Sequence, residues 1–317
     1  MEDVLDAFRA ASDPSRLRIL GLLEATELTV SELVAILGQS QPRVSRHLKV
    51  LVDAKLLVRF REGSWVFHRL NNQGQARKLI ELVPADDPVR VQDLARLEEI
   101  EQKRDEVAEQ YFAKFAPEWD RLRQLDVDEE QVANAVQEML PLINTQSLLD
   151  LGTGTGRMLQ VLGPDAGEAV GVDNSHEMLA VARSNLRRWG LGNCRLQQAD
   201  ILALPLASES FDVVVLHQVL HFLKRPWAAI AEALRVLGPA GRLLIVDLAP
   251  HTIEDLRDLH AHRRLGFGDD EVREWLAQQG FTCETIRHLS GGKNSDGLQV
   301  TIWLARRFAS SPLPQAL

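Results

Sequence analysis

The stretch LLDLGTGTGRM, residues 148–158, places an apolar run directly before three glycines that stand at every second position. Similar apolar runs, AVGVD, FDVVVLHQVL and GRLLIVDL, recur along residues 169–248, and segments typical of helices separate them. Short strands that are apolar on both faces and alternate with helices pack as a parallel sheet between two helical layers. The second half of the chain is therefore expected to be a doubly wound α/β domain.

Acidic residues stand at the ends of the first three expected strands. Asp150 ends the first run, Asp173 ends the second, and Asp200 follows the third. Ligands of such sheets bind at the carboxyl ends of the strands, where glycine lets a ligand lie against the main chain. A carboxylate at Asp173 can accept hydrogen bonds from both hydroxyls of a ribose, so the pattern predicts a nucleoside site. Glycines with a purely structural role would leave the three acids unexplained.

The glycine spacing separates two classes of nucleoside-binding enzymes. Dinucleotide enzymes use G-x-G-x-x-G, whereas residues 152–156 read G-x-G-x-G. The segments LLDLGTGTG, GVDNSHEML and QQADILALPL resemble the first three motifs of class I S-adenosylmethionine (SAM) methyltransferases. Residues 211–248 resemble the later segment of ubiquinone-type C-methyltransferases and their small-molecule relatives. The resemblance covers about residues 108–306 and implies a Rossmann-like class I methyltransferase domain.

The same resemblance implies which residues bind the cofactor, SAM or its product S-adenosylhomocysteine (SAH). Asp173 would bind the ribose, Met178 would lie against the adenine, and Asp200 would lie near the adenine amino group. Tyr111 would close over the methionine moiety, although a place in the core fits this residue equally well. The full expected set is Tyr111, Asp150, Gly152, Thr153, Gly154, Gly156, Asp173, Asn174, Met178, Asp200, Ile201 and His217.

Methyl transfer can require a base that deprotonates the acceptor. The candidate bases are His217 and His221, which lie where the acceptors of relatives bind. His217 could equally lie beside the cofactor, and His221 could equally cap the helix that follows. A further three histidines stand in the segment that leads to the acceptor site in relatives: His251, His260 and His262. Their spacing does not indicate a metal site, and no bound metal is expected.

The first 85 residues follow a different pattern. TVSELVAILG predicts a short helix ending at Gly38, QPRVSRHLKVLVDAKLL predicts a second helix, and LVRFREGSWVFHRL predicts a β-hairpin. Residues 40–78 carry nine Lys and Arg against two acids, a net charge of +7, so the rest of the chain carries −16. Two short helices, a tight turn and a basic hairpin predict a winged helix-turn-helix, mainly α with one β-hairpin, that binds DNA. The alternative is a solvated cationic helix in some other three-helix domain.

Residues 1–83 resemble the DNA-binding core of ArsR-type regulators, most specifically in the run SRHLKVL and the hairpin after it. The resemblance implies a homodimer on double-stranded operator DNA. Many relatives bind metal through cysteines in the helix before the recognition helix. That helix reads SELVAIL here and has no cysteine, so this first domain shows no receptor for an effector. The residues expected to face DNA are Ser40, Gln41, Arg43, Ser45, Arg46, His47, Lys49, Arg59 and Arg61.

The expected organisation is a winged-helix domain, a helical linker with a lid region, a SAM-binding methyltransferase domain and a tail: residues 1–83, 84–140, 141–308 and 309–317. The linker has an apolar edge, which predicts either pairing with its twin in a dimer or packing on its own chain: Val91, Leu94, Leu97 and Ile100. No apolar run reaches membrane-spanning length, and the acidic start is unlike a signal peptide, so a cytoplasmic protein is expected.

Two cysteines, Cys194 and Cys283, are too few for a disulfide framework or for the several acceptor ligands of arsenite methyltransferases. Three functions remain open. The first is a transcriptional regulator, expected to be a repressor, whose methyltransferase domain binds SAM or SAH and controls DNA binding. The second is an active small-molecule methyltransferase with autoregulatory DNA binding. The third, a nucleic-acid methyltransferase, fits least, because this half is acidic and lacks the N/D-P-P-Y/W and Pro-Cys motifs.

Overall fold

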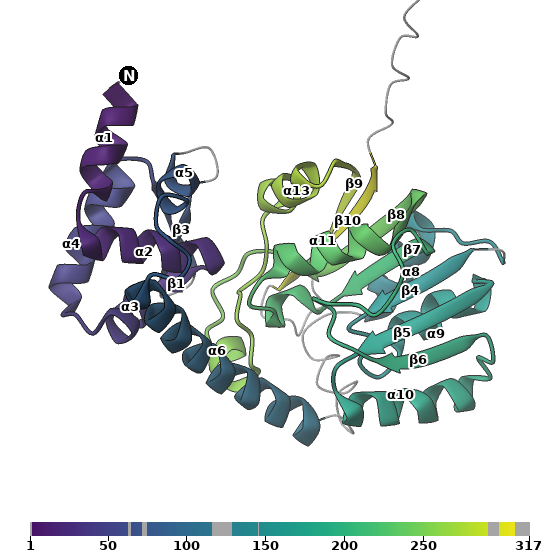
Figure 1. The fold of residues 1–317 in the computed structure, drawn as a ribbon. Helices are drawn as coiled ribbons and strands as arrows, with labels where there is room; N and C mark the ends of the chain where they lie inside the picture. Colours follow the sequence, from purple (N-terminus) through teal and green to yellow (C-terminus); the bar gives the residue numbers. More distant parts are fainter. Residues whose placement is uncertain are drawn as a thin grey trace, which may run out of the picture. The chain divides into compact units, whose positions relative to one another are not determined.

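The computed structural model describes residues 2–62, 65–71, 75–115, 129–144, 146–290 and 298–307 (Figure 1). The chain divides into two compact units, residues 1–107 and 108–317. The division falls inside helix α6 (Pro88–Phe115), within the segment expected to be the linker. Each unit has a hydrophobic core of its own.

The first unit combines short helices with a small sheet, and its sequence contains clear helix boundaries. The carboxylate of Asp13 caps α2 by accepting two backbone N–H groups. Thr29 and Glu32 form a capping box at the start of α3, and Gly38 ends that helix with φ +65°. The elements are α1 (Glu2–Ala11), α2 (Pro14–Ala25), β1 (Leu28–Thr29), α3 (Val30–Leu37), α4 (Gln41–Asp53), β2 (Leu57–Glu62), β3 (Trp65–Leu70), α5 (Ala76–Ile80) and α6.

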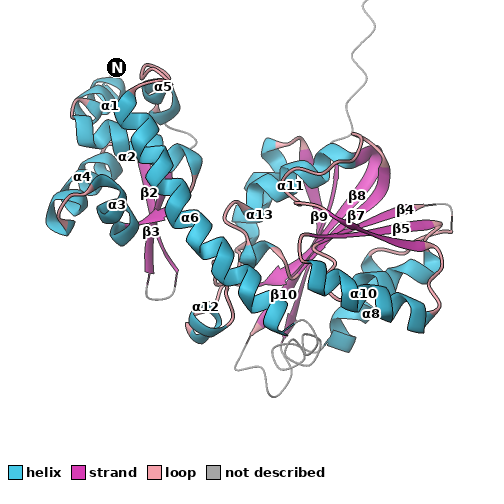
Figure 2. Cartoon of the chain, turned by 60° about the horizontal axis from the view of Figure 1, so that its bottom comes forward, coloured by secondary structure: helices cyan, strands magenta, loops and turns pink. Residues whose placement is uncertain are grey.

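Helices α3 and α4 and the β2–β3 hairpin form the winged helix-turn-helix that the sequence predicts (Figure 2). The three strands are antiparallel in the order β1–β3–β2. Leu33 and Ile36 of α3 and Leu51 of α4 are fully buried in one core cluster. The apolar stripe of α4 therefore packs inward and leaves its polar side facing out.

Helix α6 packs on the first unit. Asp93 is buried, and its two carboxylate oxygens accept hydrogen bonds from the guanidinium of Arg18 at 2.6 and 2.7 Å. Leu97 is buried in the same core, and Leu94 and Ile100 pack against it. The apolar edge of the linker thus packs on its own chain, one of the two alternatives for this edge. Val91, at its beginning, is exposed.

The second unit alternates strands and helices. Its elements are α8 (Glu129–Met139), β4 (Ser147–Leu151), α9 (Arg157–Leu162), the 3₁₀ turn η2 (Gly163–Asp165), β5 (Glu168–Asp173), α10 (His176–Trp189), β6 (Cys194–Gln198), β7 (Phe211–His217), the 3₁₀ turn η3 (Leu220–Phe222), α11 (Pro226–Val236), β8 (Leu237–Leu248), α12 (Asp255–Leu259), α13 (Asp269–Gln278), β9 (Phe281–Ser290) and β10 (Gln299–Arg307).

These strands form one seven-stranded sheet in the order β6–β5–β4–β7–β8–β10–β9. Strands β4 to β8 run parallel, and β10 lies antiparallel between β8 and β9. Successive side chains of β4 point to opposite faces of the sheet. Leu148 belongs to the core under α8 and α9, whereas Leu149 belongs to the core under α11 and α13. Helices cover both faces (Figure 2), which confirms the doubly wound, Rossmann-like fold.

Candidate functional site

The turn that follows β4 requires glycine. The backbone N–H groups of Gly152 and Thr153 both donate to the carbonyl of Val172 on β5, at 2.8 and 2.9 Å. Gly152, Gly154 and Gly156 have φ values of +71°, +53° and +91°, the region that favours glycine. A Cβ on Gly152 would also lie only 2.4 Å from Val219 Cγ2. The loop at the carboxyl edge of the sheet therefore presents its main chain without side chains at the three glycines.

Two residues outside the expected set support this loop. Gly171 lies on β5, and a Cβ there would come within 2.8 Å of both Thr153 Oγ1 and Leu159 Cδ1. Asn185 of α10 is buried and donates its side-chain N–H to the carbonyl of Thr155 at 3.0 Å. A glycine inside the strand pattern AVGVD is a signal of close approach that could have indicated Gly171.

The carboxylate of Asp173 holds the loop from the end of β5. Its Oδ2 accepts from the N–H of Gly154 at 2.8 Å, and its Oδ1 accepts from the N–H of Ser175 at 2.9 Å. Burial raises the pKa of Asp173, and the hydrogen bonds from backbone N–H groups act in the opposite direction. The N–H of Asn174 acts on the carboxylate as well, and because a carboxylate offers about four acceptor positions, Asp173 retains acceptor capacity for a ribose.

The other expected cofactor residues differ in their surroundings. Asp150 is buried, and its carboxylate accepts a hydrogen bond from the hydroxyl of Thr153 at 2.6 Å. Asp150 therefore stabilises the conformation of the loop. Asp200 is exposed, and its carboxylate accepts from the N–H of Leu202 at 2.8 Å. Met178 and Ile201 are buried, and Asn174 is exposed. The side chain of Tyr111 lies outside the described residues.

Strand β7 lies beside β4, with Leu216 paired to Leu151, so its carboxyl end reaches the same edge as the glycine loop. His217 is the last residue of β7 and is buried. The next residue, Gln218, has φ +53° and donates its N–H to the carbonyl of Val246 at 2.8 Å. After this sharp turn, the side chain of the next residue, Val219, lies next to Gly152.

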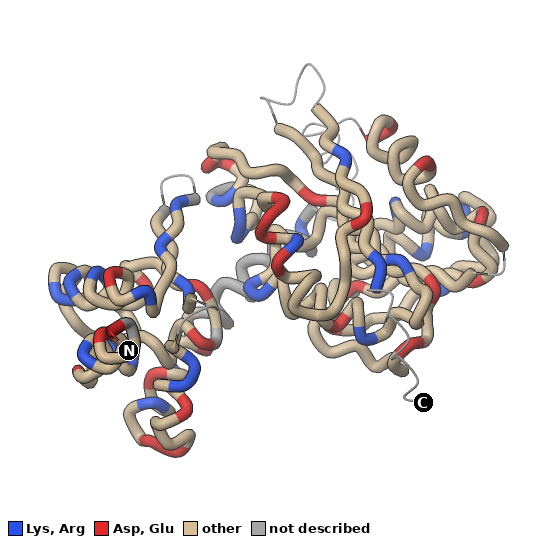
Figure 3. The backbone as a smooth tube through the Cα atoms, turned by 90° about the horizontal axis from the view of Figure 1, so that it is seen from above, with Lys and Arg blue, Asp and Glu red and all other residues tan. Residues whose placement is uncertain are grey.

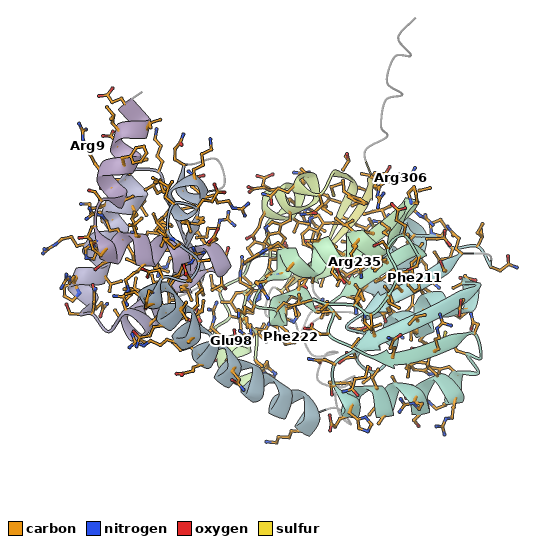
Figure 4. The ribbon with its side chains drawn as sticks, in the orientation of Figure 1. Arg9, Glu98, Phe211, Phe222, Arg235 and Arg306 are labelled. Carbon is orange, nitrogen blue, oxygen red and sulfur yellow. The ribbon has the colours of Figure 1, made fainter. Side chains whose placement is uncertain are left out.

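His221 pairs with Asp247, a residue that the sequence reasoning missed. Its Nδ1 lies 2.6 Å from Asp247 Oδ1, and the two side chains are 3% and 0% exposed. Asp247 also accepts the N–H groups of Leu220 at 3.0 Å and Leu248 at 2.7 Å. His221 therefore interacts with the end of β8 rather than capping α11. Figure 4 labels the neighbouring Phe222 at this edge of the sheet.

The DNA-facing residues of the expected set are exposed, with one exception. Arg43 and Arg46 lie on the outer side of α4, and Arg59 and Arg61 alternate along β2; Figure 3 shows the basic positions of this unit in blue. The further exposed members are Ser40, Gln41, Ser45 and Lys49. These side chains are accessible at the surface, and their contact with DNA stays a prediction.

His47 is the exception. It is only 8% exposed, and its Nδ1 lies 3.8 Å from the Asp13 carboxylate that caps α2. Burial lowers the pKa of His47, and the nearby Asp13 carboxylate acts in the opposite direction. The side chain of His47 is thus largely buried next to the start of α2, unlike the other residues of the set, and its contact with DNA stays a prediction.

Among the described residues, no group of three or more His, Cys, Asp or Glu side chains is arranged to hold a metal ion. None of the described helices combines the length and the apolar character that crossing a membrane requires.

Comparison with known proteins assigns a family to a segment of each unit. Residues 13–57 match the bacterial regulatory protein, arsR family. Residues 149–245 match a methyltransferase domain family. The methyltransferase YcgJ of Bacillus subtilis is 36% identical over 50% of this chain and 64% of its own length. The demethylmenaquinone methyltransferase of Thermus thermophilus is 36% identical over 44% of this chain and 64% of its own length.

A third relative, the arsenite methyltransferase of Aquipseudomonas alcaligenes, is 33% identical over 42% of this chain and 37% of its own length. The chain thus spans less than two thirds of the length of these relatives. Among solved structures, a chain of the Haloferax volcanii complex between the Trm112 methyltransferase activator and its methyltransferase superposes with a TM-score of 0.55 at 18% identity. It covers 64% of this chain and 100% of its own, and supports the fold.

Proposed function

Because the chain joins an arsR-family regulatory segment to a methyltransferase domain, we propose that it is a transcriptional regulator whose methyltransferase domain binds SAM or SAH. Nucleoside binding changes its affinity for operator DNA, and the protein acts as a cytoplasmic, homodimeric repressor. The observation that carries the proposal is the pre-formed loop at the end of β4. Bare main chain at Gly152 and the remaining lone pairs of Asp173 fit a nucleoside with a free ribose.

The residues named above supply the chemistry of binding. Asp173 accepts the two ribose hydroxyls, while Met178 and Ile201 offer apolar contacts to the adenine. Asp200, which is exposed after the end of β6, accepts a hydrogen bond from the adenine amino group. The exposed basic side chains of α4 and β2 supply the phosphate contacts that dominate DNA affinity.

Regulation requires that the nucleoside discriminate between two arrangements of the protein. A ligand that binds the DNA-competent and DNA-incompetent arrangements equally well shifts nothing, however tightly it binds. SAM and SAH differ by one methyl group and one positive charge, so the two are expected to act with different strength. Helix α6, whose residues belong to both units, is the segment that would carry the difference.

The test is fluorescence anisotropy of the full chain on DNA from upstream of its own gene, with SAM and SAH titrated separately at fixed salt. At least one nucleoside is expected to shift the DNA dissociation constant. Asp173→Ala should abolish the shift and leave basal DNA binding intact. The matched control is Asp165→Ala, which alters an exposed carboxylate before β5, away from the loop. A response that survives Asp173→Ala, or no response in the unaltered protein, refutes the proposal.

A second candidate function is supported by one specific observation. His221 and Asp247 form a buried pair at the carboxyl end of the sheet, the edge at which the glycine loop lies, and a histidine at this edge is a candidate base for an acceptor. Methyl transfer to a small molecule is therefore the alternative. It is tested by conversion of SAM to SAH when a small-molecule cell extract is added.

A further inference from the structure

Helix α2 and the segment that runs from α5 into α6 surround a cavity of about 210 Å³ in the first unit. Leu22 and Ile80 are buried, whereas Val89 is 46% exposed, so the cavity extends from the core of this unit to its surface. A small molecule can therefore enter it from solvent. Apolar side chains form most of the wall: Leu17, Leu22, Ile80, Val83, Val89 and Leu94.

Gly21 enlarges this cavity. It lies in the interior of α2 and lines the cavity, at a position where glycine is less favourable than alanine. Neither usual reason for a glycine applies here, because its φ is not in the left-handed region and a Cβ would meet nothing within 4 Å. Residues that break a local rule without a packing reason are expected at functional sites. Gly21 is therefore an indication of a ligand that is independent of the apolar wall.

The charged groups of the wall are already paired. The buried carboxylate of Asp93 accepts two hydrogen bonds from Arg18, at 2.6 and 2.7 Å. Arg90 donates to the carboxylate of Glu24 at 3.3 Å, and Asp87 accepts two backbone N–H groups at the start of α6. A charged molecule would either break one of these pairs or lie against apolar side chains without a partner, and both are costly. The cavity therefore suits an uncharged molecule.

The volume and the guanidinium of Arg18 indicate the size and shape of that molecule. A dry apolar cavity of about 150 Å³ binds benzene, so about 210 Å³ accommodates one aromatic ring with one or two small substituents. Arg18 lines the cavity, and its hydrogen bonds to Asp93 lie in the plane of the guanidinium. The faces of the guanidinium remain available, and such faces stack on aromatic rings. An aromatic molecule is therefore favoured over an aliphatic one.

We propose that this cavity is an effector site for a small uncharged aromatic molecule, in addition to the nucleoside site of the second unit. The ligand contacts α2 and α6 together, so its binding favours the arrangement in which α6 packs on α2. Arg96 of α6 donates to the carbonyl of Ile36 in the last turn of α3, at 3.0 Å. A change in the packing of α6 therefore acts on the helix that precedes the recognition helix α4. The effect on DNA rests on the proposed DNA binding, whereas ligand binding does not.

The first test is a calorimetric titration of toluene into the full chain, without nucleoside or DNA. Binding should be saturable, and methylcyclohexane, an aliphatic molecule of similar size, should bind more weakly. Gly21→Leu places a four-carbon side chain in the cavity and should weaken toluene binding at least ~10-fold. The matched control is Gly192→Leu, the same change at an exposed glycine of the second unit where a Cβ also meets nothing within 4 Å. It should bind toluene as the unaltered protein does.

Three results of this titration overturn the proposal: no saturable binding, equal toluene affinity of Gly21→Leu and the unaltered protein, or tighter binding of methylcyclohexane than of toluene. Gly21→Ala adds a single carbon to the same wall and should weaken toluene binding less than Gly21→Leu, so the test does not depend on one variant. Sedimentation of Gly21→Leu examines a second copy of the chain as the occupant. Its particle mass should equal that of the unaltered protein, and a smaller particle would overturn the proposal.

The second test measures DNA binding by fluorescence anisotropy at fixed salt, with and without saturating toluene. The DNA dissociation constant of the unaltered protein should change about 5-fold or more, and that of Gly21→Leu should not change. An unchanged constant in the unaltered protein overturns the effector role. If the chain binds no DNA at all, the proposed function fails, and the calorimetric titration still decides whether the cavity binds an aromatic molecule.

Discussion

Gly152→Ala tests the geometry of the loop after β4 most sharply. Two costs add at this position. A non-glycine residue at φ +71° costs about 1–2 kcal/mol. The added Cβ lies 2.4 Å from Val219 Cγ2 and 2.9 Å from Val219 Cβ, and such overpacking costs about 1–3 kcal/mol. The expected loss in the free energy of unfolding is therefore about 2–5 kcal/mol.

The matched control is Gly190→Ala at the end of α10. Gly190 has nearly the same φ, +72°, but a Cβ there meets nothing within 4 Å. Gly190→Ala should therefore lower the free energy of unfolding only by the cost of the backbone conformation, about 1–2 kcal/mol. Urea unfolding followed by tryptophan fluorescence is the assay, because five of the six tryptophans lie in residues 108–317.

A double-mutant cycle with Val219→Ala isolates the packing contribution. That change removes both Cγ atoms of Val219 but keeps its Cβ, so it relieves the clash in part. Gly152→Ala should therefore cost about 1–2 kcal/mol less in the Val219→Ala background than alone. Equal losses at Gly152 and Gly190, or an additive cycle, would refute the reasoning about this loop.

Three other predictions concern the first unit. Gly21 lies inside α2 on the wall of a cavity of about 210 Å³, and a Cβ there meets nothing within 4 Å. Gly21→Ala should therefore raise the free energy of unfolding of this unit by about 0.5–1 kcal/mol, measured by chemical denaturation. A lower free energy of unfolding would contradict this prediction. Burial lowers the pKa of His68 to about 4. A lowered pKa gives stability that is present above pH 6.5 and lost as the pH falls toward 4, by up to about 3 kcal/mol. Unfolding curves against pH measure this loss, which His68→Leu should remove; a variant with the same pH dependence would refute the assignment. Arg46→Ala should weaken operator binding by about 1–3 kcal/mol if Arg46 contacts a base pair, whereas Arg195→Ala on exposed β6 should not. Equal affinities in the anisotropy assay would mean that α4 is not the recognition helix.

The features predictable from the sequence are those that depend on neighbours along the chain. The period of apolar residues and the helix end at Gly38 identify the short helices of the first unit. The alternation of strands and helices places Asp150 and Asp173 at one edge of the sheet. Both follow from local rules, because residues at the end of a parallel strand always meet the same edge.

The features that escaped prediction depend on contacts between distant segments. Asp247 lies 26 residues after His221, and their pairing requires β7 and β8 to be neighbours in the observed register. His47 occupies a position on α4 that turns inward only because α2 packs against it there. Gly171 is needed because the loop after β4 crosses over β5. The pattern of a single segment encodes neither the His221–Asp247 pair nor the burial of His47, whereas the glycine inside the strand pattern of β5 does signal the close approach at Gly171.

The central claim is that nucleoside and DNA binding are coupled, and coupling is reciprocal by thermodynamic necessity. The most direct test is a calorimetric titration of SAH into the full chain, alone and saturated with operator DNA, in the same buffer. The account predicts that DNA changes the SAH dissociation constant by the same factor by which SAH changes the affinity for DNA. Identical SAH dissociation constants with and without DNA would contradict it.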